Sequence, residues 1–421
     1  MTRLAFDPRS TAAAALAADP IVVTGLGSWA AGSRSPDELY ALALRGRATA
    51  EWIDLDGPTQ PLRVAGSAAS AIDLEHPTLR PVRRLDRVTQ LAMLAATQAW
   101  NDAGLDWDSG LDADRVGVYC GTSRGPILKW LESVEAWGNG GVRPGSSAQT
   151  TMGSLNGVLS QALGALGPSA SVVATCASAA AAIGMAAAHL LLGEADVAIA
   201  GGAEAPIISL MAAQLGAAGV VGHHEDPHLT CRPFHAERNG LAIGEGAGFL
   251  VLERFSSARA RGRVPYARLA GWASRVDAGG RTGVTANGDG LVRAMRRALD
   301  VAEMAPRDIG YVNAHGTGTV VNDAVECLAL NEVFGAGMAP PVSSTKPVTG
   351  HCLGATPALE AIISILALRA GCLPPTANLD SVDPACDVDL ISDEPRPAAV
   401  DSVLSTSLGF WGTQAALVFT R

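Results

Sequence analysis

The chain has 421 residues, of which 48% are hydrophobic and 17% are charged, and its formal net charge at pH 7 is −10. This length suits two or three domains or one large unit with a deep core, and the composition excludes a disordered or fibrous protein. The negative charge argues against nucleic acid as the main partner, because phosphates need a basic surface, although a local basic patch can still bind an acidic protein.

The first twenty residues predict a loose N-terminal arm. Their apolar run, 12–18, is short, rich in alanine and bounded by aspartates, unlike the apolar core of a signal peptide. A longer apolar stretch, 172–192, could span a bilayer by its length, but it contains hydroxyl side chains and a histidine. We predict a buried core helix there and no membrane span. The seven cysteines are an odd number without paired spacing, which predicts free thiols in a reducing compartment, the cytoplasm.

Apolar, β-rich runs alternate with helical patterns along the chain. The runs that predict strands are 21–25, 116–120, 197–200, 248–252, 309–313 and 417–419. Helical spacing appears at 90–100, 289–302 and 359–368. Continuous apolar strands with helices between them predict an α/β protein whose sheets are covered on both faces. The polar segment 261–265, which holds Gly and Pro, predicts a boundary between a first half, 1–263, and a second half, 264–421.

Cys176 ends a β-like run and opens a helix of very small residues. At a helix N-terminus the free N–H groups and the helix dipole favour an anion, so we expect a stabilised thiolate and a site for an oxyanion. A lone buried cysteine is more often a packing residue, and the other six cysteines are interpreted in that way.

Two histidines lie in loops rich in glycine and hydroxyl side chains. His315 follows a buried strand, and His351 ends a segment that also contains Lys346. Such loops let the backbone approach a ligand closely. Neutral imidazoles can donate hydrogen bonds to a developing enolate, and Lys346 can bias the local proton positions. A single histidine is more often structural, but two of them with a cysteine at a helix start favour catalysis.

A second group of histidines lies just past the middle of the chain. His223, His224, His228 and Cys231 have a spacing that could suit a metal, but acidic residues lie between them and no paired cysteine follows. A solvated loop is the favoured interpretation. The glycines of 244–248 lack the strand–glycine–helix frame of a dinucleotide site, so we predict neither a metal nor another cofactor.

Taken in order, these motifs resemble the β-ketoacyl-acyl carrier protein synthase family of the thiolase superfamily. The matching segments are 22–27, 174–178, 200–204, 231–234, 244–248, 315–319, 344–351 and 409–413, which cover the chain after about residue 20. The resemblance implies a thiolase fold, in which two similar halves stack as five layers, α-β-α-β-α. It also implies a dimer, most simply a homodimer, with a heterodimer left open.

The resemblance assigns chemical roles to the three central residues. Cys176 would take an acyl group from the phosphopantetheine thioester of an acyl carrier protein, or from coenzyme A. His315 and His351 would hold the carbonyl of a malonyl-type thioester as it loses CO₂, and the enolate would attack the acyl group. Backbone N–H groups of Cys176 and Phe410 would form the oxyanion hole.

Other positions match supporting residues of the family. Lys346 and Glu360 match its supporting charged residues. Thr317 and Thr319 match residues that touch the pantetheine arm, and Phe410 matches the gate of the acyl site.

Several residues depart from the family pattern. His235 and Asn239 stand where the family has Asp, and Gln414 stands where it has Asn. Arg124 replaces a small or apolar pocket residue, and Trp411 replaces a glycine beside the gate. A buried unpaired cation is costly, so Arg124 could meet a polar or anionic acyl chain. Together these changes predict a short, polar or bulky substrate of specialised metabolism rather than a long fatty acyl chain.

Three functions remain open from the sequence. The leading one is a condensing enzyme of polyketide or related specialised metabolism. A ketosynthase-like cyclase of the β-lactone–γ-lactam kind would close a ring within one carrier-bound substrate. A non-catalytic chain-length partner would typically lack the nucleophile, whereas this chain keeps Cys176, His315 and His351.

Overall fold

The computed structural model describes residues 15–57, 60–278 and 285–421. Ten strands form one sheet in the order β11-β10-β14-β15-β9-β1-β8-β6-β4-β5. Their bounds are β1 Ile21–Ala30, β4 Val116–Gly121, β5 Ser169–Val172, β6 Val197–Glu204, β8 Gly246–Arg254, β9 Ala267–Val276, β10 Tyr311–Asn313, β11 Val342–Ser343, β14 Ser402–Leu408 and β15 Thr413–Thr420. The predicted apolar runs lie in β1, β4, β6, β8, β10 and β15, which confirms the α/β assignment.

The strand order shows two similar halves. In the first half, taking the strands β1, β4, β5, β6 and β8 as one to five, the spatial order is 3-2-4-5-1. The strands β9, β10, β11, β14 and β15 of the second half repeat the same order. The halves join where β1 and β9 pair over Val22–Arg268 and Val23–Ala267. We propose that the boundary between them lies between α9 (Phe255–Ala260) and β9, at 263/264.

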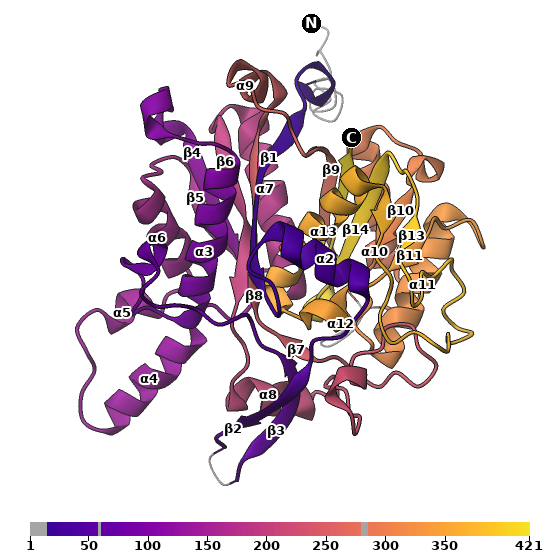
Figure 1. Cartoon of the computed structure of the whole chain (residues 1–421), viewed down its shortest axis with the longest axis horizontal. Helices are drawn as coiled ribbons and strands as arrows, with labels where there is room; N and C mark the ends of the chain where they lie inside the picture. Colours follow the sequence, from indigo (N-terminus) through magenta and orange to yellow (C-terminus); the bar gives the residue numbers. More distant parts are fainter. Residues whose placement is uncertain (1–14, 58–59, 279–284) are drawn as a thin grey trace, which may run out of the picture.

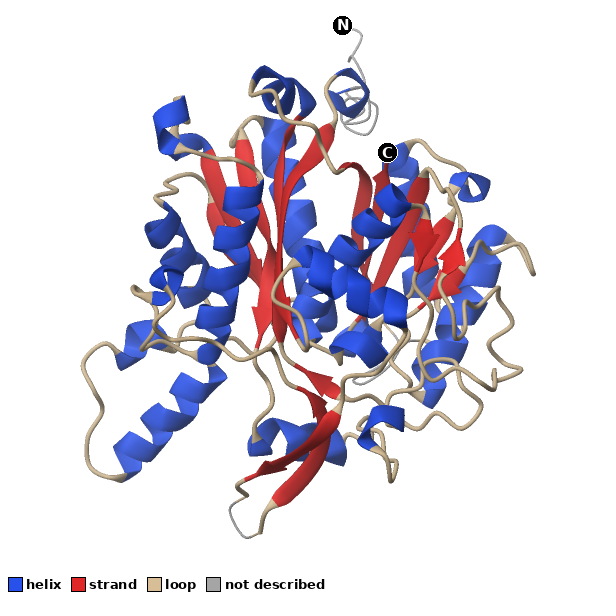
Figure 2. Cartoon of the chain, in the orientation of Figure 1, coloured by secondary structure: helices blue, strands red, loops and turns tan. Residues whose placement is uncertain are grey.

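The helices form three layers around the two half-sheets (Figures 1 and 2). The principal ones are α2 Pro36–Arg45, α3 Arg87–Asp102, α6 Ser154–Leu163, α7 Ser178–Leu192, α10 Asp289–Ala302, α11 Val320–Phe334 and α13 Thr356–Ala370. Helices α7 and α13 pack against strands of both halves, α3 and α6 cover the first half-sheet, and α10 packs on β9, β15 and α11 outside the second. The result is the five-layered thiolase fold that the sequence predicted.

The middle layer depends on very small side chains. A Cβ on Gly121 of β4 would stand 2.4 Å from the backbone nitrogen of Ala179, and one on Gly184 would stand 2.8 Å from the ring of Trp272. Glycine and alanine therefore let α7 lie directly against strands of both halves. Thr175–Leu192 and Leu353–Ala370 are long and apolar enough to cross a membrane, and 61% and 83% of them are buried inside the molecule. The predicted core helix is confirmed.

Helix α10 shows how the outer layers form. Its buried residues include Leu291, Ala294, Met295 and Ala298, which recur at helical spacing and make one apolar face. That face packs on β9 and β15. The polar residues of the helix point away from the sheet.

Smaller elements complete the fold, and some of them lie below the middle layer in Figure 1. They are β2 Glu51–Leu55, β3 Leu62–Ser67, β7 Ile243–Gly244, α4 Ile127–Gly138, α5 Ser146–Gln149, α8 Ser209–Ala217, α12 Lys346–Thr349, β12 Cys372–Leu373 and β13 Arg396–Pro397. Strands β2, β3 and β7 form a three-stranded sheet. Side chains of this sheet and of α8 share an apolar cluster with Cys176, so these elements flank the site.

Candidate active site

Cys176 lies at the tight turn between β5 and α7, as the sequence predicted. The turn Thr175–Ala177 is a short 3₁₀ segment, and Thr175 has a positive φ of 49°. The Ser178 hydroxyl accepts from the backbone N–H of Ala174 at 2.9 Å and lies 2.6 Å from the carbonyl of Thr175. These contacts fix the turn, and the Cys176 side chain is 8% exposed.

The thiol of Cys176 is protonated at neutral pH. Burial raises its pKa to about 11, and the charge of Glu204 raises the pKa further. Lys346, Arg124 and a hydrogen bond from the backbone N–H of Phe410 lower the pKa, but they do not outweigh burial. In this structure, desolvation of the sulfur therefore exceeds the stabilisation of the thiolate that we expected from the helix start.

Phe410 begins a 3₁₀ segment, Phe410–Gly412, that folds over Cys176. A Cβ on Gly409 would stand 2.0 Å from the Thr175 hydroxyl and 3.0 Å from the backbone nitrogen of Cys176, so only glycine fits there. The hydroxyls of Thr175 and Thr413 lie 2.6 Å apart and tie the two turns together. Since the N–H of Phe410 points at the sulfur, this arrangement agrees with the expected oxyanion hole.

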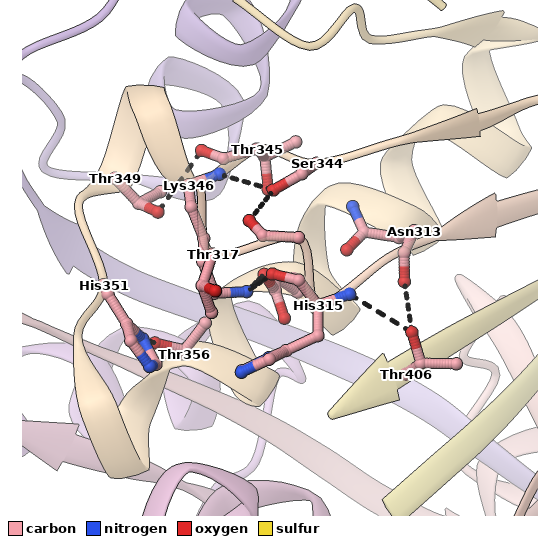
Figure 3. A network of polar contacts seen from close by, with 12 residues as sticks. Asn313, His315, Thr317, Ser344, Thr345, Lys346, Thr349, His351, Thr356 and Thr406 are labelled. Carbon is pink, nitrogen blue, oxygen red and sulfur yellow. Dashed lines mark hydrogen bonds and ion pairs between the residues drawn. The ribbon is translucent and has the colours of Figure 1, made fainter. Parts of the chain in front are cut away.

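His315 follows β10 and is held through its backbone. Glu326 of α11 accepts from the N–H groups of His315 and Gly316 at 2.8 Å each, and from the Thr406 hydroxyl at 2.7 Å. Figure 3 shows His315 and Thr406 in this network. The imidazole is 2% exposed, and its Nδ1 has no hydrogen-bond partner among the described residues.

His351 comes from a different loop and meets His315 at the site. Its Nδ1 lies 3.1 Å from the hydroxyl of Thr356, at the start of α13. The two imidazole rings lie edge to face with their centroids 5.3 Å apart (Figure 3). The ammonium of Lys346 donates to the backbone carbonyl of His315 and, at 2.6 Å, to Glu360.

Both histidines are neutral at physiological pH. Burial lowers the pKa of each well below its usual value, and the charge of Lys346 lowers both pKa values further. Burial also raises the pKa of Glu360 to about 7, while Lys346 opposes that rise. Neutral imidazoles can donate N–H hydrogen bonds to an oxygen that gains negative charge without repelling Lys346.

A cavity of about 330 Å³ opens onto these groups. Its lining includes Cys176, His315 and His351 at one end and the exposed Val320 and Val321 at the other. Thr317, Thr319, Asn239, Leu408 and Phe410 also line it. The predicted nucleophile, both histidines and the two predicted pantetheine-binding threonines therefore share one opening.

Glu204 is a structural centre of the site that the sequence analysis missed. Its buried carboxylate accepts from the backbone N–H groups of Ser123, Arg124 and Gly354 at 2.6, 3.0 and 3.1 Å, and from the Thr122 hydroxyl at 3.1 Å. Burial raises its pKa to about 7. It thereby joins the turn after β4 to the turn that follows His351.

The sequence held a signal for such residues. Glu204 and Glu326 each stand between apolar neighbours in the sequence, which predicts burial, and a buried carboxylate needs several donors. Asp323, which accepts from Thr317, Gly318 and Phe234, serves the His315 loop in the same way.

Trp411 does not fill the acyl site in this structure. Its side chain is 62% exposed and its φ is +62°. Arg124 is half-buried and does not line the cavity. Gln414 is buried and donates to Asp277 at 3.3 Å, so it anchors the base of the Phe410 turn.

The remaining departures are satisfied structurally. His235 accepts the N–H of Glu237 at 2.9 Å through Nδ1, and its Nε2 lies 2.7 Å from Asp380. Asn239 exchanges two hydrogen bonds with the backbone of His223, both 2.9 Å long. Among the described residues no three His, Cys, Asp or Glu side chains are grouped as metal ligands would be.

Comparison with known proteins agrees with this geometry. Residues 18–258 match the N-terminal domain of the Beta-ketoacyl synthase family, and residues 266–380 match its C-terminal domain. The 3-oxoacyl-[acyl-carrier-protein] synthase 2 of Staphylococcus aureus is 36% identical over 406 residues, which cover 95% of this chain and 98% of that protein.

Two solved structures superpose on nearly the whole chain. The ishigamide ketosynthase/chain length factor has a TM-score of 0.86 at 30% identity. A type II PKS ketosynthase, solved in complex with its acyl-carrier protein and bound to the hexaketide, also has a TM-score of 0.86, at 28% identity. Each match covers 96% of this chain and 99% of the other.

Proposed function

The chain belongs to the β-ketoacyl synthase family, and from that membership we propose that it joins an acyl group on Cys176 to a malonyl-type thioester on an acyl carrier protein, in polyketide or related specialised metabolism. Acyl transfer and condensation are the activities of this family. The observation that carries the assignment of roles is the meeting of Cys176, His315 and His351 at one cavity.

Loading is the first half-reaction. The Cys176 sulfur attacks the carbonyl carbon of the acyl thioester, and the bond between that carbon and the pantetheine sulfur breaks. The proton of the Cys176 thiol passes to the departing pantetheine thiolate. Because burial keeps the thiol protonated, attack and proton loss occur together at the bound thioester. The N–H groups of Cys176 and Phe410 hold the oxygen that becomes negative.

Condensation is the second half-reaction. The malonyl carboxylate leaves as CO₂, and its electron pair passes to the thioester, whose carbonyl oxygen becomes an enolate held by His315 and His351. The enolate carbon then attacks the acyl carbonyl, the bond to Cys176 breaks, and the sulfur regains a proton from solvent. Burial and the charge of Lys346 keep the two imidazoles neutral. Lys346 holds the His315 loop by its backbone carbonyl, and Glu360 pairs with Lys346.

The partners follow from the family. The thioester donor is an acyl carrier protein, with coenzyme A as the alternative source, and Thr317 and Thr319 offer hydroxyls to the pantetheine arm along the cavity. A dimer is consistent with the ketosynthase complexes that this chain resembles. Seven free cysteines support a cytoplasmic location.

Intact-mass analysis tests the loading step. Native protein incubated with acyl carrier protein thioesters should gain one acyl group, and Cys176→Ala should gain none while keeping its circular dichroism spectrum. An adduct that persists in Cys176→Ala would place the acyl group elsewhere and contradict the assignment.

Product formation tests the histidines separately from loading. His315→Ala and His351→Ala should still be acylated, but product from the malonyl thioester should fall on the order of a hundredfold, as when one oxyanion donor is removed. Native-rate product in either variant would remove that residue from the mechanism.

The cyclase alternative is separated by malonyl dependence, because ring closure would proceed without the malonyl thioester.

A further inference from the structure

Arg124 lies in the turn between β4 and α4, and its backbone is fixed while its side chain is not engaged. The Glu204 carboxylate takes the backbone N–H of Arg124 at 3.0 Å and the neighbouring donors of the same turn. Within the described part of the chain, the Arg124 guanidinium has no ion-pair partner, and its enclosed Nε has no hydrogen-bond acceptor.

The turn that carries this guanidinium lies close to the nucleophile, although Arg124 does not line the cavity that holds Cys176. The positive charge of Arg124 is felt at the Cys176 sulfur, whose pKa it lowers. Ile127 and Leu128, which follow Arg124 in the chain, pack in the same apolar cluster as Cys176 and Leu353. The turn therefore brings a cation to the edge of an otherwise apolar surface beside the nucleophile.

A cation in this position calls for an acceptor. Removing a guanidinium N–H from water without replacing its hydrogen bond is unfavourable, and a saturated alkyl chain packed against it would exclude the remaining water. The planar edge formed by Nε and a terminal nitrogen fits a carboxylate or a carbonyl oxygen. An apolar residue in this turn would instead accept alkyl chains.

We propose that Arg124 selects acyl groups whose chain carries an oxygen acceptor, either a keto oxygen or a carboxylate, over saturated chains of the same length. The proposal rests on the function assigned to Cys176. It gives that function a substrate class, that of oxygenated acyl chains. Trp411, which is exposed, has no part in this selection.

Matched acyl thioesters test the selection. Hexanoyl, 5-oxohexanoyl and glutaryl groups on one carrier protein differ only in the atoms around the fifth carbon, and octanoyl, 7-oxooctanoyl and pimeloyl groups repeat the comparison two carbons further out. The rate at which each group appears on Cys176 is measured by intact mass for native protein, Arg124→Met and Arg124→Lys. Arg143→Met, at an exposed arginine beyond α4, is the matched control.

Native protein and Arg143→Met should load at least one oxygenated chain about tenfold faster than its alkyl counterpart, as expected for one lost buried hydrogen bond. Arg124→Met should abolish or reverse that ratio. A preference for the dicarboxylates that weakens with salt identifies a carboxylate, and an equal preference for the keto chains identifies a neutral carbonyl. Arg124→Lys should keep a preference for the dicarboxylates better than a preference for the keto chains.

Equal loading of alkyl and oxygenated chains by native protein would overturn the proposal, and so would a ratio unchanged in Arg124→Met. Equal loading by native protein is also expected if a carboxylate of a second subunit already pairs with Arg124. Failure of the proposed function looks different, because then no acyl group would load on Cys176 in any variant. If Arg124→Met does not fold, the native ratio and Arg124→Lys still decide.

Discussion

At the scale of single residues, Lys346 acts beside burial on the protonation of the site. It is fully buried, contacts the His315 carbonyl and Glu360, and its charge lowers the pKa of both histidines. A buried histidine could be satisfied as a cation by a carboxylate, but here the carboxylate is already paired with the lysine. The imidazoles are therefore kept as neutral donors over the range in which a free histidine would titrate.

This arrangement predicts a pH-dependent effect of His351→Asn. Burial lowers the pKa of His351 in the folded state, so below about pH 6.5 the unfolded chain binds more protons than the folded chain. The stability that the neutral His351 contributes is therefore lost as the pH falls. His351→Asn has no imidazole to protonate, so its stability does not show this decrease. The difference in free energy of unfolding between native protein and His351→Asn should therefore become smaller from pH 7.5 to pH 5.5, by at most about 1.4 kcal/mol per pH unit.

Urea unfolding at the two pH values measures this change. His351→Gln, which also lacks a titratable imidazole, is the companion variant and should show the same change with pH. A gap between native protein and His351→Asn that widens as the pH falls would contradict a lowered histidine pKa.

The candidate site residues could be located from the sequence because each stands in a short, ordered motif, whereas the charge of Cys176 could not be predicted. Cys176 lies at the predicted strand-to-helix turn, yet the buried sulfur is protonated rather than ionised. That outcome depends on how much water the complete fold removes from the sulfur, which a local pattern does not contain. Glu204 was missed for the same reason, since its four donors come from two parts of the chain that are distant from it in sequence, 122–124 and Gly354.

At the scale of elements, the Phe410–Gly412 turn stores backbone strain. Trp411 has a φ of +62°, a region that a bulky side chain rarely adopts, and its exposed indole does not offset this by burial. The turn is held at its ends, by Gly409 against Thr175 and by the backbone N–H of Asp277 donating to Gly412 at 2.7 Å. The strain is therefore imposed by the anchors.

We predict that Trp411→Gly is more stable than Trp411→Ala by about 1 kcal/mol. Glycine normally destabilises relative to alanine, but only glycine adopts this φ without a Cβ penalty. Thermal unfolding of the two variants measures the difference, and both lack the indole, so its contacts cancel. The usual order, with alanine more stable, would show that the turn relaxes to negative φ in solution.

Elements with a strong periodic pattern were located well, and short or polar ones were not. The predicted helix 289–302 has the same bounds as α10, while 90–100 and 359–368 lie inside the longer α3 and α13. Strands β9 and β14 were missed because neither contains a continuous apolar run: β9 mixes arginine, glycine and serine with apolar residues, and β14 is rich in serine and threonine. Both are held by long-range pairing, which sequence periodicity does not encode.

At the scale of the whole molecule, the site depends on both halves. Cys176 comes from the first half, and both histidines come from loops of the second half, His315 after β10 and His351 after α12. Helices α7 and α13 bring them together in the middle layer. The sequence motifs predicted which residues belong to the site. Their position at one cavity follows from the repeated strand order, which the sequence patterns alone did not predict.

The two edges of the ten-stranded sheet differ. At one edge, the residues that precede β13 cover β11, since Val342 bridges Leu390. At the other edge, β5 pairs with β4 alone within the described chain, and Val173 beside it is 55% exposed. An open strand edge is a site for pairing with another chain.

Helix α4 adds an apolar surface to the half that ends in β5. Trp130, Val134 and Trp137 recur at helical spacing and are 50%, 55% and 74% exposed. Figure 1 shows α4 projecting from the rest of this half. A large apolar face on a projecting helix is costly in a monomer, so it supports contact with a second subunit.

We therefore predict that Trp137→Glu shifts the protein from dimer to monomer. Placing a carboxylate in an apolar contact removes a large buried side chain and desolvates a charge, which together cost several kcal/mol of association free energy. Sedimentation velocity should show the native protein at twice the chain's mass and the variant at the single mass. Val264→Glu, at an 81% exposed residue between the halves, is the control and should stay dimeric. A Trp137→Glu variant that remains dimeric down to nanomolar concentration would place the interface on another face.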